Sequence, residues 1–209
     1  MDEEWGEKNR SAEGAPVGHD RVVALPTMDL LTAGLDHIRR SPADVGTLEL
    51  VVCRPAVGER QVVDEGWLDL DLGLVGDNWR VRGSTSTPDG SPHPDAQLTV
   101  MGSRAAALVA GPVERWGLAG DQLYIDLDLS EGQLPAGSRL AIGSAVIEIT
   151  AKPHRGCAKF AHRFGPEALR FVNTGPGRSL NLRGRNARVV TPGPVRAGNS
   201  VRRLPPPTP

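Results

Sequence analysis

The sequence has few cysteines, almost no net charge and no long apolar run. Only Cys53 and Cys157 occur in 209 residues, and they lie far apart in the chain. Two thiols cannot build the disulfide framework of a small secreted scaffold, so free thiols in a reducing cytoplasm are expected. A net charge of −1 predicts no general attraction to nucleic acid or to an anionic membrane. No run approaches the roughly 20 apolar residues that cross a bilayer, and the acidic N-terminus does not resemble a secretory signal.

The composition along the chain indicates one folded domain with polar ends. Residues 1–20 are polar and contain glycine and proline, which predicts a disordered lead. Residues 205–209 form a proline-rich tail that cannot extend a sheet. The single domain is therefore expected over 21–204, a length that can bury a sizeable core.

Short strand-like runs between turn signals dominate this domain. Strands are predicted over 47–54, 67–74, 97–102, 123–129, 139–150, 187–190 and 199–204, and helices over 28–40, 103–111 and 164–173. Leu and Asp alternate in 67–74, which predicts one strand with an apolar and an acidic face. Ser103 is the predicted N-cap of the second helix, and Pro166 lies in the first turn of the third. Residues 76–95 read as a long loop. Many short strands and few helices favour a mainly β fold, a closed barrel with short peripheral helices.

Two short sequence motifs recur along the chain. LDLDLGLVGDNW (68–79) and GLAGDQLYIDLDLS (117–130) share GL-x-GD and LDL in reversed order. The simplest interpretation is that Gly-Asp forms a turn and Leu-Asp-Leu an amphipathic strand.

The segment TAKPHRGCAKFAHRFG (150–165) concentrates basic residues around one cysteine. Those near Cys157 are Lys152, His154, Arg155, Lys159, His162 and Arg163. Positive surroundings lower the pKa of a thiol, and a thiolate is both a nucleophile and a soft metal ligand. The same cations could bind a phosphate. However, a lone cysteine is most often a small buried hydrophobe, and Cys53, within LELVVCR, reads as strand packing.

Three passages resemble the MOSC domain, named for the C-terminal domain of molybdenum cofactor sulfurases. RLAIGSAVIEITAKPHRGCAKF (139–160) resembles its strand and loop with a near-invariant cysteine. LAGDQLYIDLDLSEGQLPAGSRLAIG (118–143) and LRGRNARVVTPGPVRAGNSVRRL (182–204) resemble the motifs before and after it. The matches run from 97 to 204, in the family's order, and resemble the stand-alone bacterial type. The chain departs from the pattern at Gln122, at Asn199 and in the GDNW loop, which lacks a histidine.

The resemblance implies a MOSC-type β-barrel with a cleft for a molybdopterin-type molybdenum cofactor, and Cys157 as ligand to molybdenum. Such a protein would be a small molybdenum-dependent oxidoreductase that reduces N-hydroxylated compounds with a redox partner, or a sulfur carrier that meets donor and acceptor proteins. The candidate cofactor-binding residues are Lys152, His154, Arg155, Lys159, Arg163, Arg183, Arg185 and Arg188. No lysine has a pattern that supports a Schiff base with pyridoxal phosphate.

Three other readings stay open. A zinc site could use His154, Cys157 and His162 with Cys53, although the usual zinc spacings are absent. A carboxylate-dependent hydrolase could draw on Asp69, Asp71, Asp126, Asp128 or Glu131. The barrel could also be a non-catalytic, metal-free binding module. An exposed Cys157 beside a groove lined by arginine and lysine would support the cysteine site, and a buried thiol would exclude it.

Overall fold

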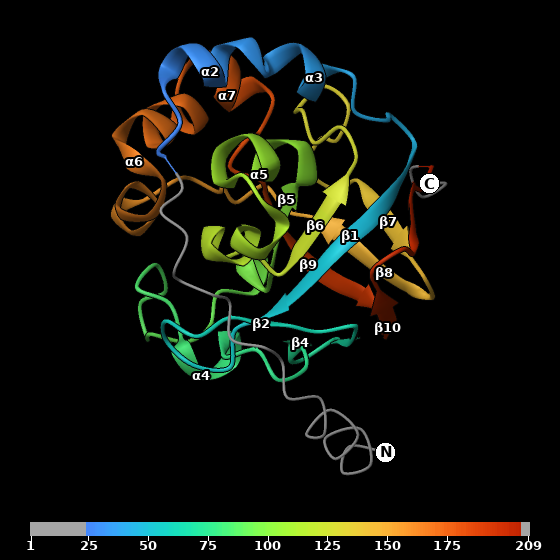
Figure 1. Ribbon diagram of the computed structural model, residues 1–209. Helices are drawn as coiled ribbons and strands as arrows, with labels where there is room; N and C mark the ends of the chain where they lie inside the picture. The colour runs from blue at the N-terminus through green and yellow to red at the C-terminus, as the bar shows by residue number, and fades with distance from the viewer. Residues whose placement is uncertain (1–23, 206–209) are drawn as a thin grey trace.

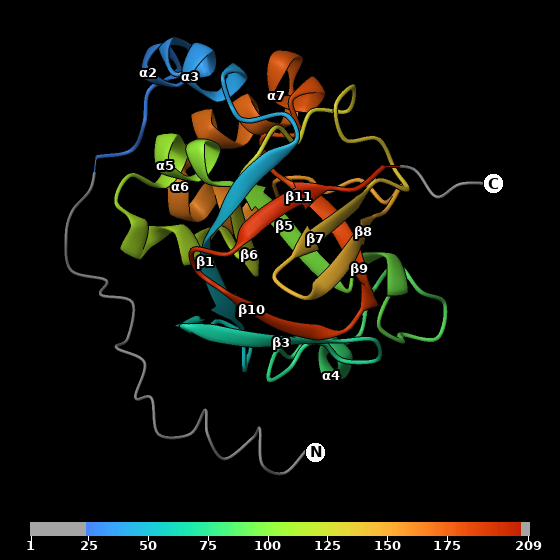
Figure 2. The same ribbon diagram turned by 90° about the vertical axis from the view of Figure 1, so that its right-hand side faces the viewer.

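Seven strands pair in a closed ring in the computed structural model, which describes residues 24–205 (Figures 1 and 2). They are β1 (Val45–Cys53), β5 (Leu98–Gly102), β6 (Leu123–Asp126), β7 (Arg139–Ile142), β8 (Ala145–Ile149), β9 (Arg185–Thr191) and β11 (Ser200–Arg203). The order is β11-β7-β8-β9-β5-β6-β1, and β1 pairs again with β11. The β5–β6 pair is parallel and the other pairs of the ring are antiparallel. The predicted β-barrel is confirmed.

The barrel interior is filled by the inward-facing side chains of its strands. On β8, Ala145, Ile147 and Ile149 alternate with partly exposed neighbours and are fully buried. They join side chains from the other strands in one apolar cluster. Because successive side chains of a strand point to opposite faces, this alternation places one face of each strand in the core. The loops that leave the strand ends are therefore free to carry chemistry.

A small second sheet lies at one end of the barrel (Figure 2). It contains β10 (Gly193–Arg196), β3 (Glu65–Asp69) and β4 (Gly73–Leu74), while the short β2 (Gln61–Val62) pairs with β1. Leu68, Leu74 and Val195 from this sheet belong to the barrel's own core cluster. The second sheet therefore covers the end of the barrel and shares its core.

The single strand predicted over 67–74 is wrong, because this segment folds as a hairpin. Oδ1 of Asp69 accepts hydrogen bonds from the backbone N–H groups of Asp71 (2.8 Å) and Leu72 (2.9 Å). An aspartate that captures the following amides in this way favours a turn over a continued strand. The reversal buries Leu68 and Leu74 and leaves the leucines between them exposed.

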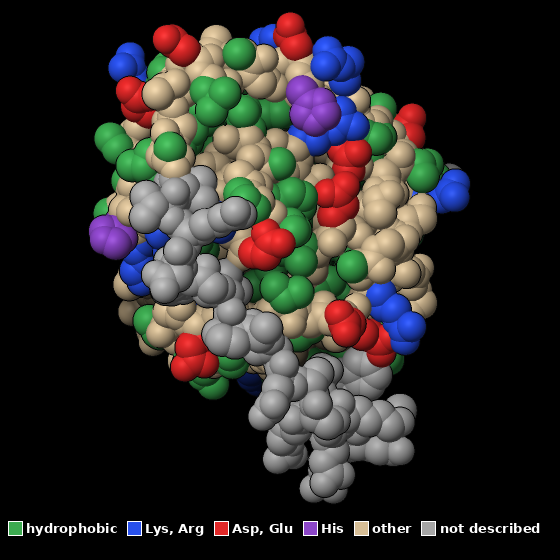
Figure 3. All heavy atoms as spheres, in the orientation of Figure 1, with side chains coloured by type: hydrophobic (Ala, Val, Ile, Leu, Met, Phe, Trp, Pro, Cys, Tyr) green, Lys and Arg blue, Asp and Glu red, His purple; other side chains and the backbone are tan. Residues whose placement is uncertain are grey.

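Helices cover the outer face of β1, β5 and β6 (Figure 1). They are α2 (Met28–Ala33), α3 (Leu35–Arg39), α5 (Ser103–Ala110), η2 (Val113–Ala119), α6 (Ala158–Asn173) and α7 (Gly175–Ser179), while α4 (Trp79–Arg82) and η1 (Pro94–Ala96) interrupt the long 76–95 segment. Their apolar side chains form a second cluster against the barrel, which includes Leu31, Tyr124 and Phe160. On the face shown in Figure 3, apolar side chains occupy much of the centre among a few acidic ones, and most of the basic side chains lie near the edge.

Glycine changes two of the predicted helices. The helix expected over 28–40 divides into α2 and α3 at Gly34, where a Cβ would lie 2.5 Å from the Leu108 side chain. The helix expected over 164–173 begins earlier, at Ala158, and kinks at Gly165, whose φ is +89°. Pro166 then opens the second half of α6, as Pro suits a first turn.

Two further expectations concern the chain's ends and caps. Ser103 is the first residue of α5 rather than its N-cap, which is Gly102 and has no side-chain capping bond. The predicted lead, 1–20, and nearly all of the predicted tail lie outside the described residues. Between residues 24 and 205, no helix combines the length and apolar character needed to cross a membrane.

Candidate functional site

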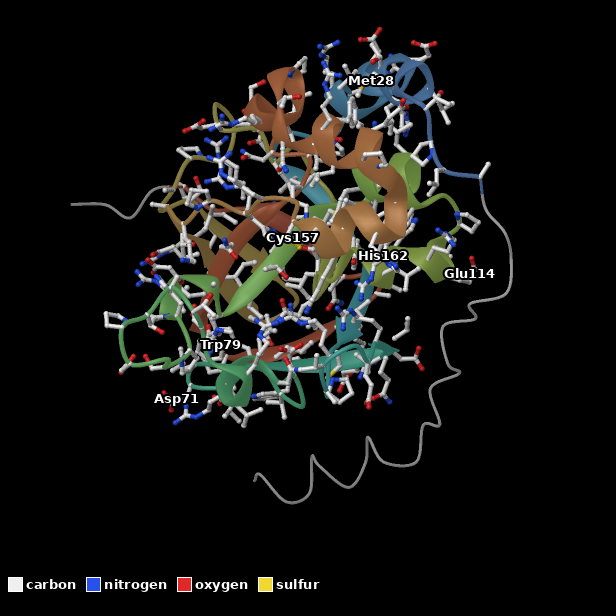
Figure 4. All side chains as sticks on the ribbon, turned by 90° about the vertical axis from the view of Figure 1, so that its left-hand side faces the viewer. Met28, Asp71, Trp79, Glu114, Cys157 and His162 are labelled. Carbon is white, nitrogen blue, oxygen red and sulfur yellow. The ribbon has the colours of Figure 1, made fainter. Side chains whose placement is uncertain are left out.

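The loop that follows β8 brings Cys157 to the surface at the start of α6 (Figure 4). Its backbone is extended, with φ −124° and ψ −179°, so the chain is straight until the helix begins. Cys53 is buried, and this burial, reinforced by the Asp77 carboxylate, raises the pKa of its thiol to about 12. Of the two thiols, only that of Cys157 is accessible to a ligand or a reagent.

The residue before Cys157 is held by one side chain at the far end of α6. The Gly156 N–H donates to Oδ1 of Asn173 (2.9 Å), and Nδ2 of Asn173 donates to the Gly156 carbonyl (3.0 Å). The amide of Asn173 thereby binds both backbone groups of Gly156, as a neighbouring strand would. A Cβ at Gly156 would lie 2.8 Å from the Leu169 side chain, so a larger residue would require that side chain to shift.

A cavity of about 460 Å³ opens beside this loop. Its cationic lining residues are Lys152, Arg155, Arg178, Arg183 and Arg185. Among the described residues that line it, Glu131 is the one carboxylate, so the cavity is strongly positive. The volume is in the range of small-molecule and cofactor sites. Cys157 does not line the cavity but lies two residues beyond Arg155, and Asn173, which holds the cysteine loop, is part of the cavity wall.

A buried polar group forms part of the cavity wall. Nη1 of Arg183 lies 2.5 Å from Oδ2 of Asp121, and Nδ1 of His154 lies 3.4 Å from the other carboxylate oxygen. Arg183 also lies over the ring of Phe160, 5.2 Å from its centre. Burial, together with the positive charge of Arg183, lowers the pKa of His154 to about 3, although Asp121 opposes the shift. His154 is therefore neutral near pH 7.

Some polar atoms of this group have no hydrogen-bond partner among the described residues. They are Nε of Arg183, Oδ1 of Asp121 and Nδ1 of His154. Buried donors without acceptors are costly, so an orphaned guanidinium N–H in a cavity wall suits a ligand acceptor. Burial also lowers the pKa of Arg185, an effect that Glu131 offsets in part.

The structure brings together only some of the predicted site residues. Lys152, His154, Arg155, Arg183 and Arg185 line the cavity. Lys159 is exposed on α6, and Arg163 donates to the carbonyl of Leu118. Arg188 points away from the cavity on the outside of the barrel, where it pairs with Glu148 at 2.6 Å.

The residues considered for a zinc site and for a carboxylate-dependent hydrolase are dispersed in the structure. His154 lies in the cavity wall, whereas Cys157 and His162 are exposed and Cys53 is in the core. Within residues 24–205, no three His, Cys, Asp or Glu side chains are placed to hold a metal ion. The carboxylates serve the fold: Asp69 and Asp128 accept backbone N–H bonds in turns, Asp126 pairs with Arg104, and Asp71 is exposed in the β3–β4 turn. Glu131 alone reaches the cavity.

The repeated Gly-Asp motif contains residues whose role the local sequence does not reveal. Gly76 and Gly120 both have left-handed φ angles, +86° and +94°, and each precedes an aspartate with a fully buried side chain. Asp77 binds Arg54 and Asp121 binds Arg183. Nη1 of Arg54 also donates to the Gly120 carbonyl (2.9 Å), and this bond joins the two copies of the motif. The repeated Gly-Asp motif therefore forms two turns that each bind an arginine.

The sequence of most of the barrel and of its cysteine loop matches a known family. The family model of the MOSC domain matches residues 93–202, just over half of the chain. This chain belongs to the MOSC domain family. The matched range contains Cys157, the residue Asn173 that holds its loop, and all of the cavity's lining residues.

Two solved structures show the same fold at low identity, and a third is similar over much of its length. YuaD from Bacillus subtilis is 16% identical, with a TM-score of 0.52 over 75% of this chain and 94% of that one. A hypothetical protein is 21% identical, with a TM-score of 0.50 over 81% and 71%. YiiM from Escherichia coli is 20% identical, with a TM-score of 0.48 over 78% and 72%. The comparison with curated proteins gave no significant match.

Proposed function

We propose that this MOSC-domain protein binds a molybdopterin-type molybdenum cofactor, with the Cys157 thiolate as its ligand to molybdenum. The observation that carries the proposal is an exposed thiol two residues from the lining of a positive cavity of about 460 Å³. Thiolate sulfur is a soft metal ligand, and the anionic phosphate of such a cofactor needs cationic partners.

The residues present fit this group. Lys152, Arg155 and Arg178 would bind the phosphate from the more exposed part of the cavity wall, while Arg183 and Arg185 would donate from the buried part. The orphaned Nε–H of Arg183 would gain an acceptor. Neutral His154 adds a polar contact without a further positive charge. Asn173 would hold Gly156 still, so that the adjacent thiol keeps one position.

A bound cofactor would supply redox or sulfur-transfer chemistry at molybdenum. The protein would then be a small oxidoreductase that acts on N-hydroxylated compounds with a redox partner, or a sulfur carrier. The exposure of Cys157 favours carriage as the second function, because a thiol at the surface can be reached by a donor or acceptor protein.

Metal analysis of two cysteine variants tests the ligand assignment. The protein would be made in a host that supplies the cofactor, and molybdenum would be measured by mass spectrometry. Wild type should contain molybdenum and Cys157→Ala should have lost it, with an unchanged circular dichroism spectrum. Cys53→Ala is the matched control and should retain the metal, because its thiol is buried in the core. Full metal content in Cys157→Ala would show that another group holds the cofactor.

Intact mass measurement separates the two functions. A carrier should gain one sulfur atom on Cys157 after incubation with a persulfide donor, which transfers its outer sulfur to the Cys157 thiolate and leaves as a thiol, and reduction should remove it. An oxidoreductase should bind molybdenum and carry no persulfide. If neither the metal nor the persulfide is found, the barrel is a metal-free binding module.

A further inference from the structure

Four successive carbonyl groups at the end of η2 each accept a hydrogen bond from a different arginine. The bonds are Arg60 Nε to Gly117 (3.2 Å), Arg163 Nη1 to Leu118, Arg183 Nη2 to Ala119 (2.9 Å) and Arg54 Nη1 to Gly120 (2.9 Å). The Gly117 carbonyl also accepts from the backbone N–H of Gly120 (3.1 Å). The last carbonyls of a helix carry partial negative charge, so they attract cations. The backbone of 117–120 thus gathers arginines from distant parts of the chain.

These arginines are not equally neutralised. Arg54 and Arg183 are paired with buried carboxylates, those of Asp77 and Asp121. Within residues 24–205, neither Arg60 nor Arg163 forms an ion pair. Carbonyl oxygens satisfy single N–H groups but do not cancel the charge of a guanidinium.

The arginines also repel one another. Burial and the nearby charges of Arg163 and Arg54 lower the pKa of Arg60. Arg54, Arg60 and Arg163 therefore form one cluster around the carbonyls of residues 117, 118 and 120. Within residues 24–205 only Arg54 of the three is ion-paired, to Asp77, so the charges of Arg60 and Arg163 have no carboxylate partner there.

The cluster lies apart from the cavity assigned to the cofactor. None of its three arginines lines that cavity. The segment 117–120 lies between them, because Arg183 reaches Ala119 from the cavity wall while the cluster binds the neighbouring carbonyls. Figure 4 shows nitrogen-tipped side chains gathered in the region between Cys157, His162 and Trp79.

We propose that Arg60 and Arg163, supported by Arg54, form a second anion-binding site for a divalent oxyanion of the phosphate class. A phosphate dianion would balance most of the excess charge and accept from guanidinium N–H groups that the carbonyls leave unused. The anion is either free or the terminal phosphate of a larger molecule. The site does not depend on the cofactor proposal, because the cluster is complete without Cys157.

Calorimetric titration of the full-length, metal-free protein with inorganic phosphate tests the site. Arg60→Gln and Arg163→Gln should each weaken phosphate binding by about ten-fold or more, the effect of losing one charge-assisted hydrogen bond. The control Arg188→Gln removes an exposed arginine on the outside of the barrel and should bind phosphate like wild type. The site is refuted if wild type binds no phosphate, or if both glutamine variants bind it normally.

Two further sets of variants show where the anion binds and control for variants that fail to fold. Arg178→Gln alters only the cavity; if it abolishes phosphate binding while Arg60→Gln does not, the anion binds in the cavity and the second site is wrong. Arg60→Lys and Arg163→Lys keep the charge, and both should restore part of the affinity that the glutamine variants lose.

Titration of cofactor-loaded protein separates the two sources of the anion. Unchanged phosphate affinity would mean that the site takes an anion other than the cofactor's own. Phosphate binding that is lost on loading, in a protein whose Arg60→Gln variant also loads poorly, would assign the site to the cofactor's phosphate. Because the metal-free titration needs no molybdenum, the failure of one proposal leaves the other intact.

Discussion

At the scale of single residues, the position of Cys157 depends on Asn173, whose amide binds both backbone groups of Gly156. Asn173→Ala removes both bonds and should lower the free energy of unfolding by about 1–3 kcal/mol. It should also speed hydrogen exchange at the Gly156 amide and reduce molybdenum content. Hydrogen exchange measured by NMR reads this out directly.

The neighbouring Thr174 provides the control. Thr174→Ala removes an exposed side-chain bond to the Arg170 carbonyl (2.7 Å) and should leave Gly156 exchange unchanged. Asn173→Asp keeps the acceptor for the Gly156 N–H, so this amide should stay protected although the second bond is lost. Equal exchange in wild type and Asn173→Ala would mean that the loop is held by other contacts.

His154 links the cavity to the pH dependence of stability. Its pKa is about 3 in the folded protein and near 6.5 in an unfolded chain. The unfolded state therefore binds more protons between these values, and folding stability falls as pH falls from about 6.5 towards 3. This one group should cost about 2 kcal/mol between pH 7 and pH 5.

Urea unfolding at several pH values measures this effect. His154→Gln cannot take up the proton, so its stability should decline less between pH 7 and pH 5 than that of wild type. His162→Gln removes an exposed histidine and should keep the wild-type slope. The slopes are compared rather than the absolute stabilities, because a change at His154 also alters packing at pH 7. Parallel curves for wild type and His154→Gln would contradict the neutral, buried assignment.

At the scale of elements, the sequence predicts strands where alternation and burial agree. The runs 47–54, 97–102 and 139–150 become β1, β5 and the β7–β8 hairpin, with Gly143 at its turn. The prediction fails over 67–74, where the same alternation is present but the Asp69 carboxylate captures two amides and reverses the chain. A local hydrogen bond there overrides periodicity.

The candidate site also has one part that the sequence predicts and another that it does not. The basic loop around Cys157 could be predicted because its residues are contiguous in sequence. Asn173 binds Gly156 across 17 positions, and Arg60 reaches Gly117 across 57. No local pattern reports such contacts, because they depend on how α6 and η2 pack against the barrel. Arg188 shows the converse, since its place in a basic segment does not bring it to the cavity.

At the scale of the whole molecule, the barrel and the small sheet are joined by the buried pair Arg54–Asp77. Arg54 directly follows β1, and Asp77 lies in the loop after β4. Nε and Nη2 of Arg54 donate to the two carboxylate oxygens, at 2.7 and 2.9 Å. Oδ1 of Asp77 also accepts from the N–H of Trp79 (2.9 Å), which begins α4. This pair therefore fixes the cover of the barrel relative to the barrel.

Asp77→Asn should separate these two parts energetically. It leaves a buried guanidinium without its counter-charge, which should lower the free energy of unfolding by about 3–5 kcal/mol. Asp36→Asn breaks an exposed pair with Arg39 and should cost at most about 1 kcal/mol. Urea denaturation followed by tryptophan fluorescence measures both, and Trp79, buried beside Asp77, reports on the junction.

The double variant Arg54→Met/Asp77→Leu should be more stable than Asp77→Asn, because no charge is left buried and unpaired. If Asp77→Asn costs no more than Asp36→Asn, the two sheets are held together by their shared apolar core alone.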